Sequence, residues 1–173
     1  MMSRNWLLIL MLLSGGVLAE GDNDVIGYWA SPTSIFEIQV IDGALQGEVR
    51  ALLNPIYLPD EDSGGRTGLV RTDDNNPDAE LTGRPILGLP MFSEYQLEGG
   101  RWKGKIYDPE SGNTYQSHMK INGVGDLEIR GYIGMPMFGR TATFAPVQRC
   151  TINILAMTAQ LAIENPCASQ QDD

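Results

Sequence analysis

The chain has 173 residues and a formal net charge of −10, from 12 basic residues against 22 acidic ones. This length suits one domain that folds without a metal or dense disulfides, and the acidic balance excludes binding to the phosphate backbone of nucleic acids. Glycine contributes 20 residues and proline 10, which indicates many turns and short strands and excludes coiled-coil and multi-span membrane classes.

The N-terminus has the pattern of an export signal. Arg4 supplies a positive charge, residues 6–13 (WLLILMLL) form an apolar run, and Val17 and Ala19 place small residues before a cleavage site after Ala19. The run is shorter than the ~20 residues that span a bilayer, and no cysteine follows that could accept a lipid. We therefore expect residues 1–19 to be a cleaved signal peptide and the protein to be soluble, periplasmic and not lipidated.

Alternating apolar and polar residues predict antiparallel strands through the body of the chain. The apolar residues of 36–40 alternate with polar ones, and Asp42-Gly43 follows as a hairpin signal because both positions tolerate positive φ. The same alternation returns in residues 45–51, 102–106, 115–121, 127–132 and 140–144. Short, turn-bounded runs at this spacing are typical of a barrel or a sandwich. These runs predict an all-β fold in residues 20–147; with the resemblance described below, we expect a single antiparallel β-barrel rather than a sandwich.

Two stretches depart from the strand pattern. Residues 54–84 are rich in Asp, Asn, Gly and Pro, and a loop of that length is usually functional or partly structured. Residues 151–164 are predicted as a helix across an open end or an outer face of the barrel. Cys150 and Cys167 flank this helix, and in an oxidising compartment we expect them to be bonded, with two free thiols as the alternative. The tail, residues 148–173, is thus expected to carry a short C-terminal helix and a disulfide.

Three ordered blocks of sequence resemble a known bacterial family. They are residues 73–78 (DDNNPD) with 84–89 (RPILGL), residues 102–109 (WKGKIYDP) with 111–115 (SGNTY), and residues 127–134 (LEIRGYIG) with 138–141 (FGRT). In order and spacing they are similar to the exported family catalogued as domain of unknown function 2147, and the resemblance covers residues 27–144. It implies a small lipocalin-like β-barrel in the cell envelope, without an agreed biochemical activity.

Single residues also resemble lipocalin features. Gly27-Tyr28-Trp29 looks like the Gly-x-Trp that opens the first strand of lipocalins, where the Trp closes the narrow end and an Arg from a late strand packs on its face. By this resemblance Arg140 is the expected partner of Trp29, through a cation–π contact worth ~1–2 kcal/mol. Two features depart from the family: Phe144 stands where members commonly carry a Trp, and the tail beyond Val147 lies outside the pattern.

Arg130 and Tyr132 are the sharpest candidates for ligand binding. Residues two apart on a strand point to the same face, and inside a barrel this pair could hold a ligand carboxylate, as a similar Arg-x-Tyr pair does in intracellular fatty-acid-binding barrels. If Leu127 and Ile129 face the core, however, Arg130 and Tyr132 face outward unless a bulge at Gly131 turns them. A structural or surface role therefore stays open for both.

Asp74, Asn76 and Asp78 place oxygen atoms at alternate positions, as calcium loops do. The stretch lacks the Gly and the bidentate Glu that complete such a loop. Asx turns, in which Asn and Asp bond their own backbone, suit the same residues. We keep calcium as a candidate beside the Asx-turn interpretation and expect no other metal and no cofactor.

Other polar residues fit structural roles. Asp108 and Gly112 have the positions that a hairpin turn requires, with Asp first and Gly at positive φ. His118 is the only histidine and has no nucleophile near it in sequence, so a solvated side chain is expected rather than a catalytic one. The apolar connection 134–138 (GMPMF) contains two methionines; we expect it to pack in the core or at the rim, with an adaptable binding surface as the alternative.

The sequence favours binding over catalysis. We predict a non-enzymatic periplasmic barrel that holds a small apolar or amphipathic molecule, with no nucleic acid and no membrane span. The candidate ligand-binding residues are Arg130, Tyr132, Arg84 and Asp78. One alternative is an envelope or protein-interaction protein whose barrel is filled by its own side chains. The other is a hydrolase-type enzyme using loop carboxylates, which a cleft joining Asp73 or Asp78 to Arg84 would favour.

Overall fold

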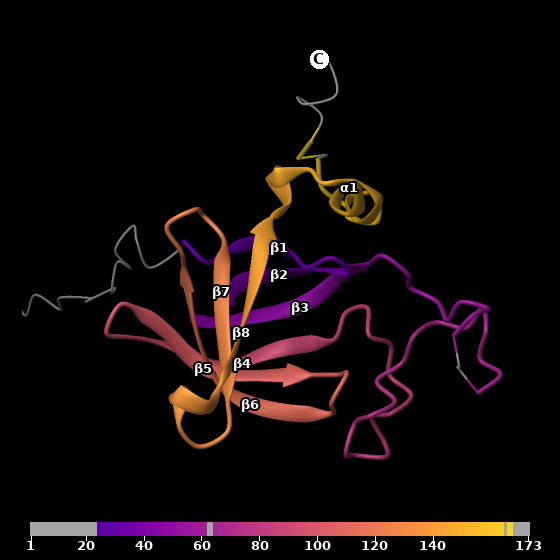
Figure 1. Ribbon diagram of the computed structural model, residues 1–173, viewed down its shortest axis with the longest axis horizontal. Helices are drawn as coiled ribbons and strands as arrows, with labels where there is room; N and C mark the ends of the chain where they lie inside the picture. Colours follow the sequence, from indigo (N-terminus) through magenta and orange to yellow (C-terminus); the bar gives the residue numbers. More distant parts are fainter. Residues whose placement is uncertain (1–23, 62–63, 165, 168–173) are drawn as a thin grey trace, which may run out of the picture.

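Eight antiparallel strands close into a barrel in sequence order (Figure 1). This computed structural model describes residues 24–61, 64–164 and 166–167, so the predicted signal peptide lies outside the described residues. The strands are β1 (Gly27–Ala30), β2 (Ser34–Ile41), β3 (Ala44–Leu52), β4 (Pro90–Glu98), β5 (Arg101–Asp108), β6 (Asn113–Ile121), β7 (Leu127–Tyr132) and β8 (Arg140–Pro146). Each strand pairs with the next, and β8 returns to β1 through two residue pairs, Trp29 with Pro146 and Ala30 with Ala145. The predicted all-β barrel is confirmed.

Inward-facing side chains fill the barrel toward the end where β5 and β7 begin. Aromatic rings meet in the middle of this lumen core, where the Phe36 ring lies 5.2 Å from Phe92 and 4.9 Å from Phe144. Trp29 is buried and its Nε1 donates to the Val25 carbonyl at 2.9 Å. The buried members of the lumen core are Val25, Trp29, Phe36, Ile38, Leu45, Phe92, Tyr95, Trp102, Met119, Leu127 and Ile129.

Strands β1 and β4 lie outside the runs of alternating residues; β1 was expected only from the lipocalin-like Gly27-Tyr28-Trp29, and β4 was not predicted. The buried residues Phe92 and Tyr95 are three apart rather than two. The pairing of β4 with β5 shifts register between Ser93 and Gln96, and Glu94 has a φ of 58°. This bulge inserts an extra residue and breaks the period of two on which strand prediction depends.

The C-terminal helix covers the outer face of β1, β2 and β3. Helix α1 (Ile152–Thr158) is about half as long as expected, and the side chain of Thr151 caps it by accepting from the Ile154 amide. Its buried residues Ile154 and Met157 join a second apolar cluster with Ile35 of β2. The disulfide between Cys150 and Cys167 is present, as predicted. No described helix has the length and apolar character needed to cross a membrane.

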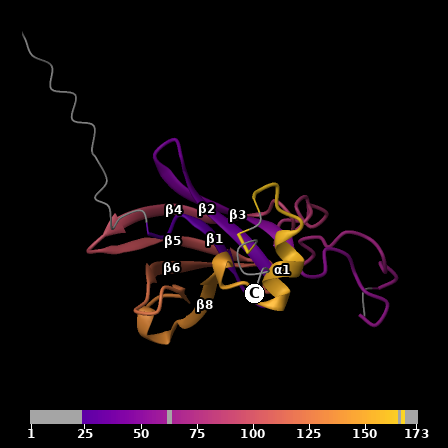
Figure 2. The same ribbon diagram turned by 90° about the horizontal axis from the view of Figure 1, so that it is seen from above.

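The described part of the chain between β3 and β4 extends beside the barrel, outside its strands (Figures 1 and 2). Two isolated bridges give it local structure, one between Ile56 and Val70 and one between Thr72 and Pro85. This segment contains most of the irregular stretch predicted from the sequence, and polar side chains hold it to β5, as described below.

A methyl group at Gly104 should destabilise the barrel. An added Cβ would lie 2.6 Å from the Tyr95 ring and 2.8 Å from the Ser93 carbonyl. We expect Gly104→Ala to lower the free energy of unfolding by about 1–3 kcal/mol, the usual cost of overpacking a core. Gly123→Ala is the control because nothing lies within 4 Å of its Cβ, and urea denaturation of the two variants measures the difference. Equal stabilities would contradict the close packing at Gly104.

The disulfide should stabilise the tail. Its two cysteines are 17 residues apart, and closing a loop of that size contributes roughly 3 kcal/mol. We expect dithiothreitol to lower the free energy of unfolding of the wild type by about this amount and to leave a Cys150→Ser/Cys167→Ser variant unchanged, as measured by urea denaturation. Two reactive thiols in the non-reduced protein would show that the bond is absent.

Candidate functional site

A pocket of about 760 Å³ opens at the end of the barrel where β5 and β7 end and β6 and β8 begin. Ile106, Ile129 and Phe144 line its inner part and also contact the lumen core. The barrel is therefore filled at one end and open at the other. This volume lies within the range of pockets that bind small molecules.

Small inward residues leave this space empty. Gly131 of β7 and Ala142 of β8 line the pocket, and Ala142 is exposed although it alternates with Phe144 on the inward face. A Cβ added at Gly131 would lie 3.6 Å from the Cβ of Tyr115 and 3.8 Å from a methyl of Ile106, which is ordinary contact. The pocket is thus a consequence of side-chain size at two positions.

Arg140 is the cation of the pocket. It is the first residue of β8, is exposed, and is the one positively charged residue among the described residues that line the pocket. Its guanidinium has no hydrogen bond or ion pair with any other residue in the described part of the chain. The acidic lining residue Asp108 is already engaged, because its carboxylate accepts from the Glu110 amide at 3.0 Å and from the Ser111 hydroxyl at 2.7 Å.

Two tyrosines belong to the same lining as Arg140. Tyr115 and Tyr132 both line the pocket, and the hydroxyl of Tyr115 lies 3.1 Å from that of Ser111. A Tyr hydroxyl can donate to an anionic group while its ring contacts an apolar chain. The pocket therefore combines an apolar inner part with a polar rim that carries one unpaired positive charge.

The structure gives Arg130 a structural position on the outer face. It pairs with His118 across β6 and β7, and its guanidinium donates to the Pro136 carbonyl at 2.8 Å, to the Thr141 hydroxyl at 2.9 Å and to the Met137 carbonyl at 3.3 Å. These bonds hold the connection between β7 and β8. Of the predicted Arg-x-Tyr pair, Tyr132 alone lines the pocket, and its role with a ligand stays a prediction.

The structure separates Arg140 from Trp29, so the expected cation–π contact is wrong. Trp29 pairs with Pro146 at the end of β8, whereas Arg140 begins that strand and pairs with Gly131. Six residues of strand correspond to about 20 Å. Gly27, which precedes Trp29 by two residues, has a φ of 133° that favours glycine.

Asp73 organises the segment between β3 and β4. Its carboxylate is fully buried and accepts from Asn76 Nδ2 at 2.7 Å, Tyr107 OH at 2.7 Å and Arg84 Nε at 2.9 Å. Arg84 also forms an ion pair with it at 2.8 Å and stacks 5.5 Å above the ring of Tyr107. Burial alone would raise the pKa of Asp73, but these donors outweigh it and hold the pKa below its usual value.

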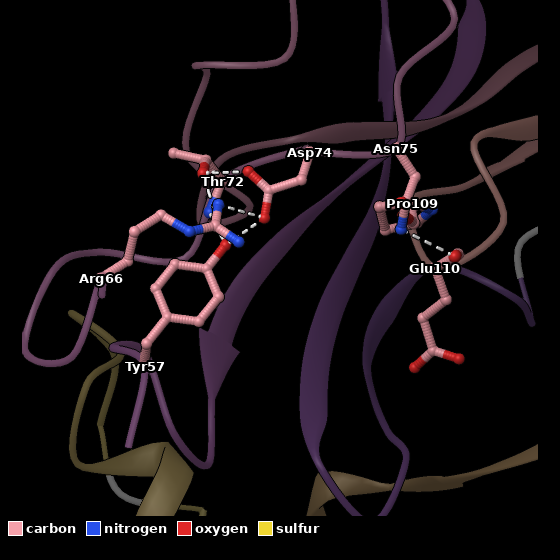
Figure 3. A network of polar contacts seen from close by, with 7 residues as sticks. All are labelled: Tyr57, Arg66, Thr72, Asp74, Asn75, Pro109 and Glu110. Atoms are coloured by element: carbon pink, nitrogen blue, oxygen red, sulfur yellow. Dashed lines mark hydrogen bonds and ion pairs between the residues drawn. The ribbon is translucent and has the colours of Figure 1, made fainter. Parts of the chain in front are cut away.

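A second polar cluster forms around Asp74, the next residue of the chain (Figure 3). The carboxylate of Asp74 accepts from the hydroxyls of Tyr57 and Thr72 and pairs with Arg66. Arg66 also lies 4.4 Å from the centre of the Tyr57 ring. Desolvation opposes ionisation, yet the donors from Arg66, Thr72 and Tyr57 together lower the pKa of Asp74 to about 2.

The calcium candidates point to different partners. The oxygen of Asn76 accepts from the Asp78 amide at 2.9 Å, and Asp78 in turn accepts from the Glu80 amide at 3.0 Å. These are the Asx turns given as the alternative, while Asp74 belongs to the cluster of Figure 3. Within the described ranges, no group of three acidic, His or Cys side chains is placed to hold a metal.

The turn between β5 and β6 connects this segment to the pocket. Gly112 has a φ of 68° and donates to the Asp108 carbonyl at 2.8 Å, in agreement with the turn chemistry read from the sequence. Asn75 Nδ2 donates to the Glu110 carbonyl at 2.9 Å (Figure 3). A side chain at Gly112 would collide with the Asn75 carbonyl, 1.8 Å from the added Cβ.

Of the candidate ligand-binding residues, Arg84 and Asp78 lie in the segment and do not line the pocket. His118 lies on the outer face opposite Lys103 and Arg130. Desolvation and these cations lower its pKa, so it is neutral at pH 7. The residue pattern did not identify Tyr115, Ala142 or Phe138 as pocket residues, although the alternation in residues 127–132 and 140–144 places small residues at inward positions.

An eight-stranded up-and-down barrel with a pocket at one end is the architecture of lipocalin-like proteins. The family described as "Uncharacterized protein conserved in bacteria (DUF2147)" matches residues 27–145, and the chain belongs to this family. Protein HP1028 from Helicobacter pylori, whose solved structure is described as belonging to the lipocalin family, is similar in fold. It is 24% identical with a TM-score of 0.53, over 70% of this chain and 82% of that one. Among curated proteins, none matches the chain.

The buried carboxylate of Asp73 should make stability depend on acid. The pKa of Asp73 is lowered in the folded state, so on acidification the unfolded state takes up the proton first. The ionised Asp73 therefore stabilises the folded state fully above about pH 5, and this contribution declines as the pH falls toward the folded pKa. We expect Asp73→Asn to cost about 1–3 kcal/mol at pH 7 and to flatten the decline, as measured by urea denaturation between neutral and acidic pH. Asp78→Asn, which can keep its exposed Asx turn, is the control and should behave as the wild type; an unchanged slope in Asp73→Asn would contradict this role.

Proposed function

We propose that the protein is exported to the periplasm and there binds a small amphipathic molecule with an anionic head group. The single observation that carries this proposal is the unpaired Arg140 at the rim of an apolar-lined pocket of about 760 Å³. The apolar part of the ligand lies against Ile106, Ile129 and Phe144, and its head group meets Arg140.

The two parts of the pocket contribute in different ways. Removing apolar surface from water stabilises the complex by roughly 25 cal/mol per Å², and this term does not depend on which apolar chain is bound. A charge-assisted bond from Arg140 to a carboxylate or phosphate contributes about 1.5–3 kcal/mol and fixes the orientation of the ligand. Selectivity for an anionic head therefore rests on Arg140.

The surroundings of Arg140 support an anionic partner. Asp108 is the one acid in the described lining, and both of its carboxylate oxygens accept bonds within its own turn. In the described part of the chain it forms no ion pair with Arg140, whose guanidinium stays available to a ligand. In a chain with a net charge of −10, a cation left without a partner at a pocket rim is a specific feature and not part of a general basic surface.

The two alternative functions are a hydrolase-type enzyme and a protein-interaction protein with a filled barrel. Asp73 and Arg84 do meet, but as a buried ion pair outside the pocket, so this pair lends no support to the hydrolase. The filled half of the barrel fits the interaction protein as well as the binder. The open half and the unpaired Arg140 favour the binder.

Removing the charge of Arg140 should weaken binding of anionic ligands selectively. We expect Arg140→Gln to raise the Kd of a dansyl-labelled undecanoic acid about tenfold or more, and to leave the Kd of its methyl ester unchanged, because the charged bond contributes more than ~1.4 kcal/mol. Fluorescence titration measures both. Arg101→Gln, an exposed arginine at the start of β5, is the control, and equal loss for acid and ester would contradict the assignment.

A large side chain at position 142 should block the pocket. Ala142 lines the pocket, whereas Thr143 is the next residue of β8 and does not. We expect Ala142→Trp to abolish binding of both probes and Thr143→Trp to retain it, with urea denaturation showing that both variants are folded. Binding by Ala142→Trp equal to the wild type would place the ligand elsewhere.

A further inference from the structure

Four large apolar side chains project into solvent from the connection between β7 and β8. Their exposed fractions are 74% for Ile133, 57% for Met135, 71% for Met137 and 75% for Phe138. We call these four residues the apolar tip. The sequence favoured core or rim packing for residues 134–138; the exposure excludes the core, and Phe138 lies at the pocket rim. Exposed apolar groups gathered in this way usually mark a surface that contacts another body.

The backbone below the apolar tip is fixed. The 3-10 helix η2 (Pro136–Phe138) closes with bonds from the Phe138 amide to the Met135 carbonyl and from the Gly139 amide to the Pro136 carbonyl. Arg130 donates to two carbonyls of this helix from the outer face of β7. Gly139 packs so closely that an added Cβ would lie 2.5 Å from the Gly131 carbonyl. The side chains of the tip are therefore held outward by an ordered support.

The chain segment that carries the apolar tip has no acidic residue. The chain has 22 acidic residues, yet none lies between Glu128 and Glu164, and Asp108 is the one acid in the described pocket lining that Ile133 and Phe138 share. Arg130 and Arg140 flank the tip on the two strands that it connects, and Arg140 has no partner among the described residues. An apolar group beside an unpaired guanidinium complements acyl chains beside phosphate groups.

The apolar tip is continuous with the mouth of the pocket. Ile133 and Phe138 belong to the tip and also line the pocket. A bilayer that covers the tip would place its own lipids at the pocket mouth, so an amphipathic molecule could enter without crossing water. A protein partner or a second copy of the chain on the same surface would instead close the mouth.

We propose that the apolar tip, together with Arg140, is a docking surface for an anionic phospholipid bilayer. The tip inserts among the acyl chains, and Arg140 contacts lipid phosphates. Arg130 acts as a positioning residue because it holds the backbone of η2. This docking goes beyond the proposed function and does not depend on it, since the tip meets the bilayer with the pocket empty.

Vesicle flotation tests the docking surface. The mature protein should float with mixed vesicles of phosphatidylethanolamine and phosphatidylglycerol, and Met137→Ser/Phe138→Ser should weaken this binding at least about tenfold. Ile152→Ser and Val124→Ser are matched controls, because their residues are 83% and 73% exposed and lie away from the tip. Helix α1, which begins with Ile152, lies at the other end of β8 from η2 (Figure 1). Wild type that stays unbound, or controls that lose binding equally, would overturn the proposal.

Tryptophan quenching tests insertion. The wild-type residues Trp29 and Trp102 are buried, so the signal from a new tryptophan at the tip is separable. Brominated lipids should quench Phe138→Trp and leave Ile152→Trp unquenched. Sedimentation without vesicles compares the oligomeric state of the wild type with that of Met137→Ser/Phe138→Ser. A dimeric wild type and a monomeric variant would show that the tip binds a second copy of the chain, which would overturn the proposal. Ligand binding in the pocket is titrated without vesicles, so it is measured independently of bilayer docking, and either activity can be lost while the other is retained.

Discussion

The lumen of an eight-stranded barrel is just wide enough for side chains to fill it, so the size of each inward residue decides where a cavity can exist. In this barrel large residues occupy the end where β5 and β7 begin, and the Phe36, Phe92 and Phe144 rings meet in the middle. Beyond these rings the inward positions of β7 and β8 carry Gly131 and Ala142. The small residues Gly131 and Ala142 on these two neighbouring strands therefore determine that a pocket exists and at which end of the barrel it lies.

The polar segment between β3 and β4 supports the barrel at the same end. Asp73 ties the segment to Tyr107 near the end of β5, and Asn75 bonds the turn that follows. That turn contains Asp108, a residue of the pocket rim. The segment is thus a brace for the rim. Its carboxylates Asp73 and Asp74 are engaged in hydrogen bonds and ion pairs that hold the segment together. The stretch therefore resembles a calcium loop in sequence but forms no metal site in the described residues.

The sequence predicted those features that depend on local geometry. The hairpin at Asp42-Gly43 is one, because the two residues have φ values of 52° and 78°. The outward direction of Arg130 was raised only as a condition on Ile129 facing the core, and Arg130 was kept as a candidate ligand-binding residue, although it does not line the pocket. The disulfide followed from two cysteines near in sequence and an oxidising compartment.

Features that depend on register or on neighbours in space were not predicted. The bulge at Glu94 broke the period of two and hid β4. The resemblance to lipocalins predicted a cation–π contact between Arg140 and Trp29. The neighbours of Trp29 depend on which end of β8 pairs with β1, and a pattern of residues does not determine that pairing register. The exposure of Phe138 likewise depends on η2 and its bonds to Arg130, which form only when β7 and β8 pair.

The net charge constrains how the apolar tip can meet a bilayer. A chain with a charge of −10 is repelled by anionic lipids at any orientation that brings its acids within a Debye length, about 8 Å at physiological salt. The segment from Ile129 to Arg140, which carries the tip, contributes no acid, so an approach by the tip lessens this repulsion and leaves Asp108 as the acid at the pocket rim. Salt screens both the repulsion between the acidic residues and anionic lipids and the attraction between Arg140 and lipid phosphates. Charge therefore mainly sets the orientation in which the molecule approaches the bilayer. The free energy of docking must then come from the apolar side chains, and the orientation that inserts them also turns the pocket mouth toward the lipids.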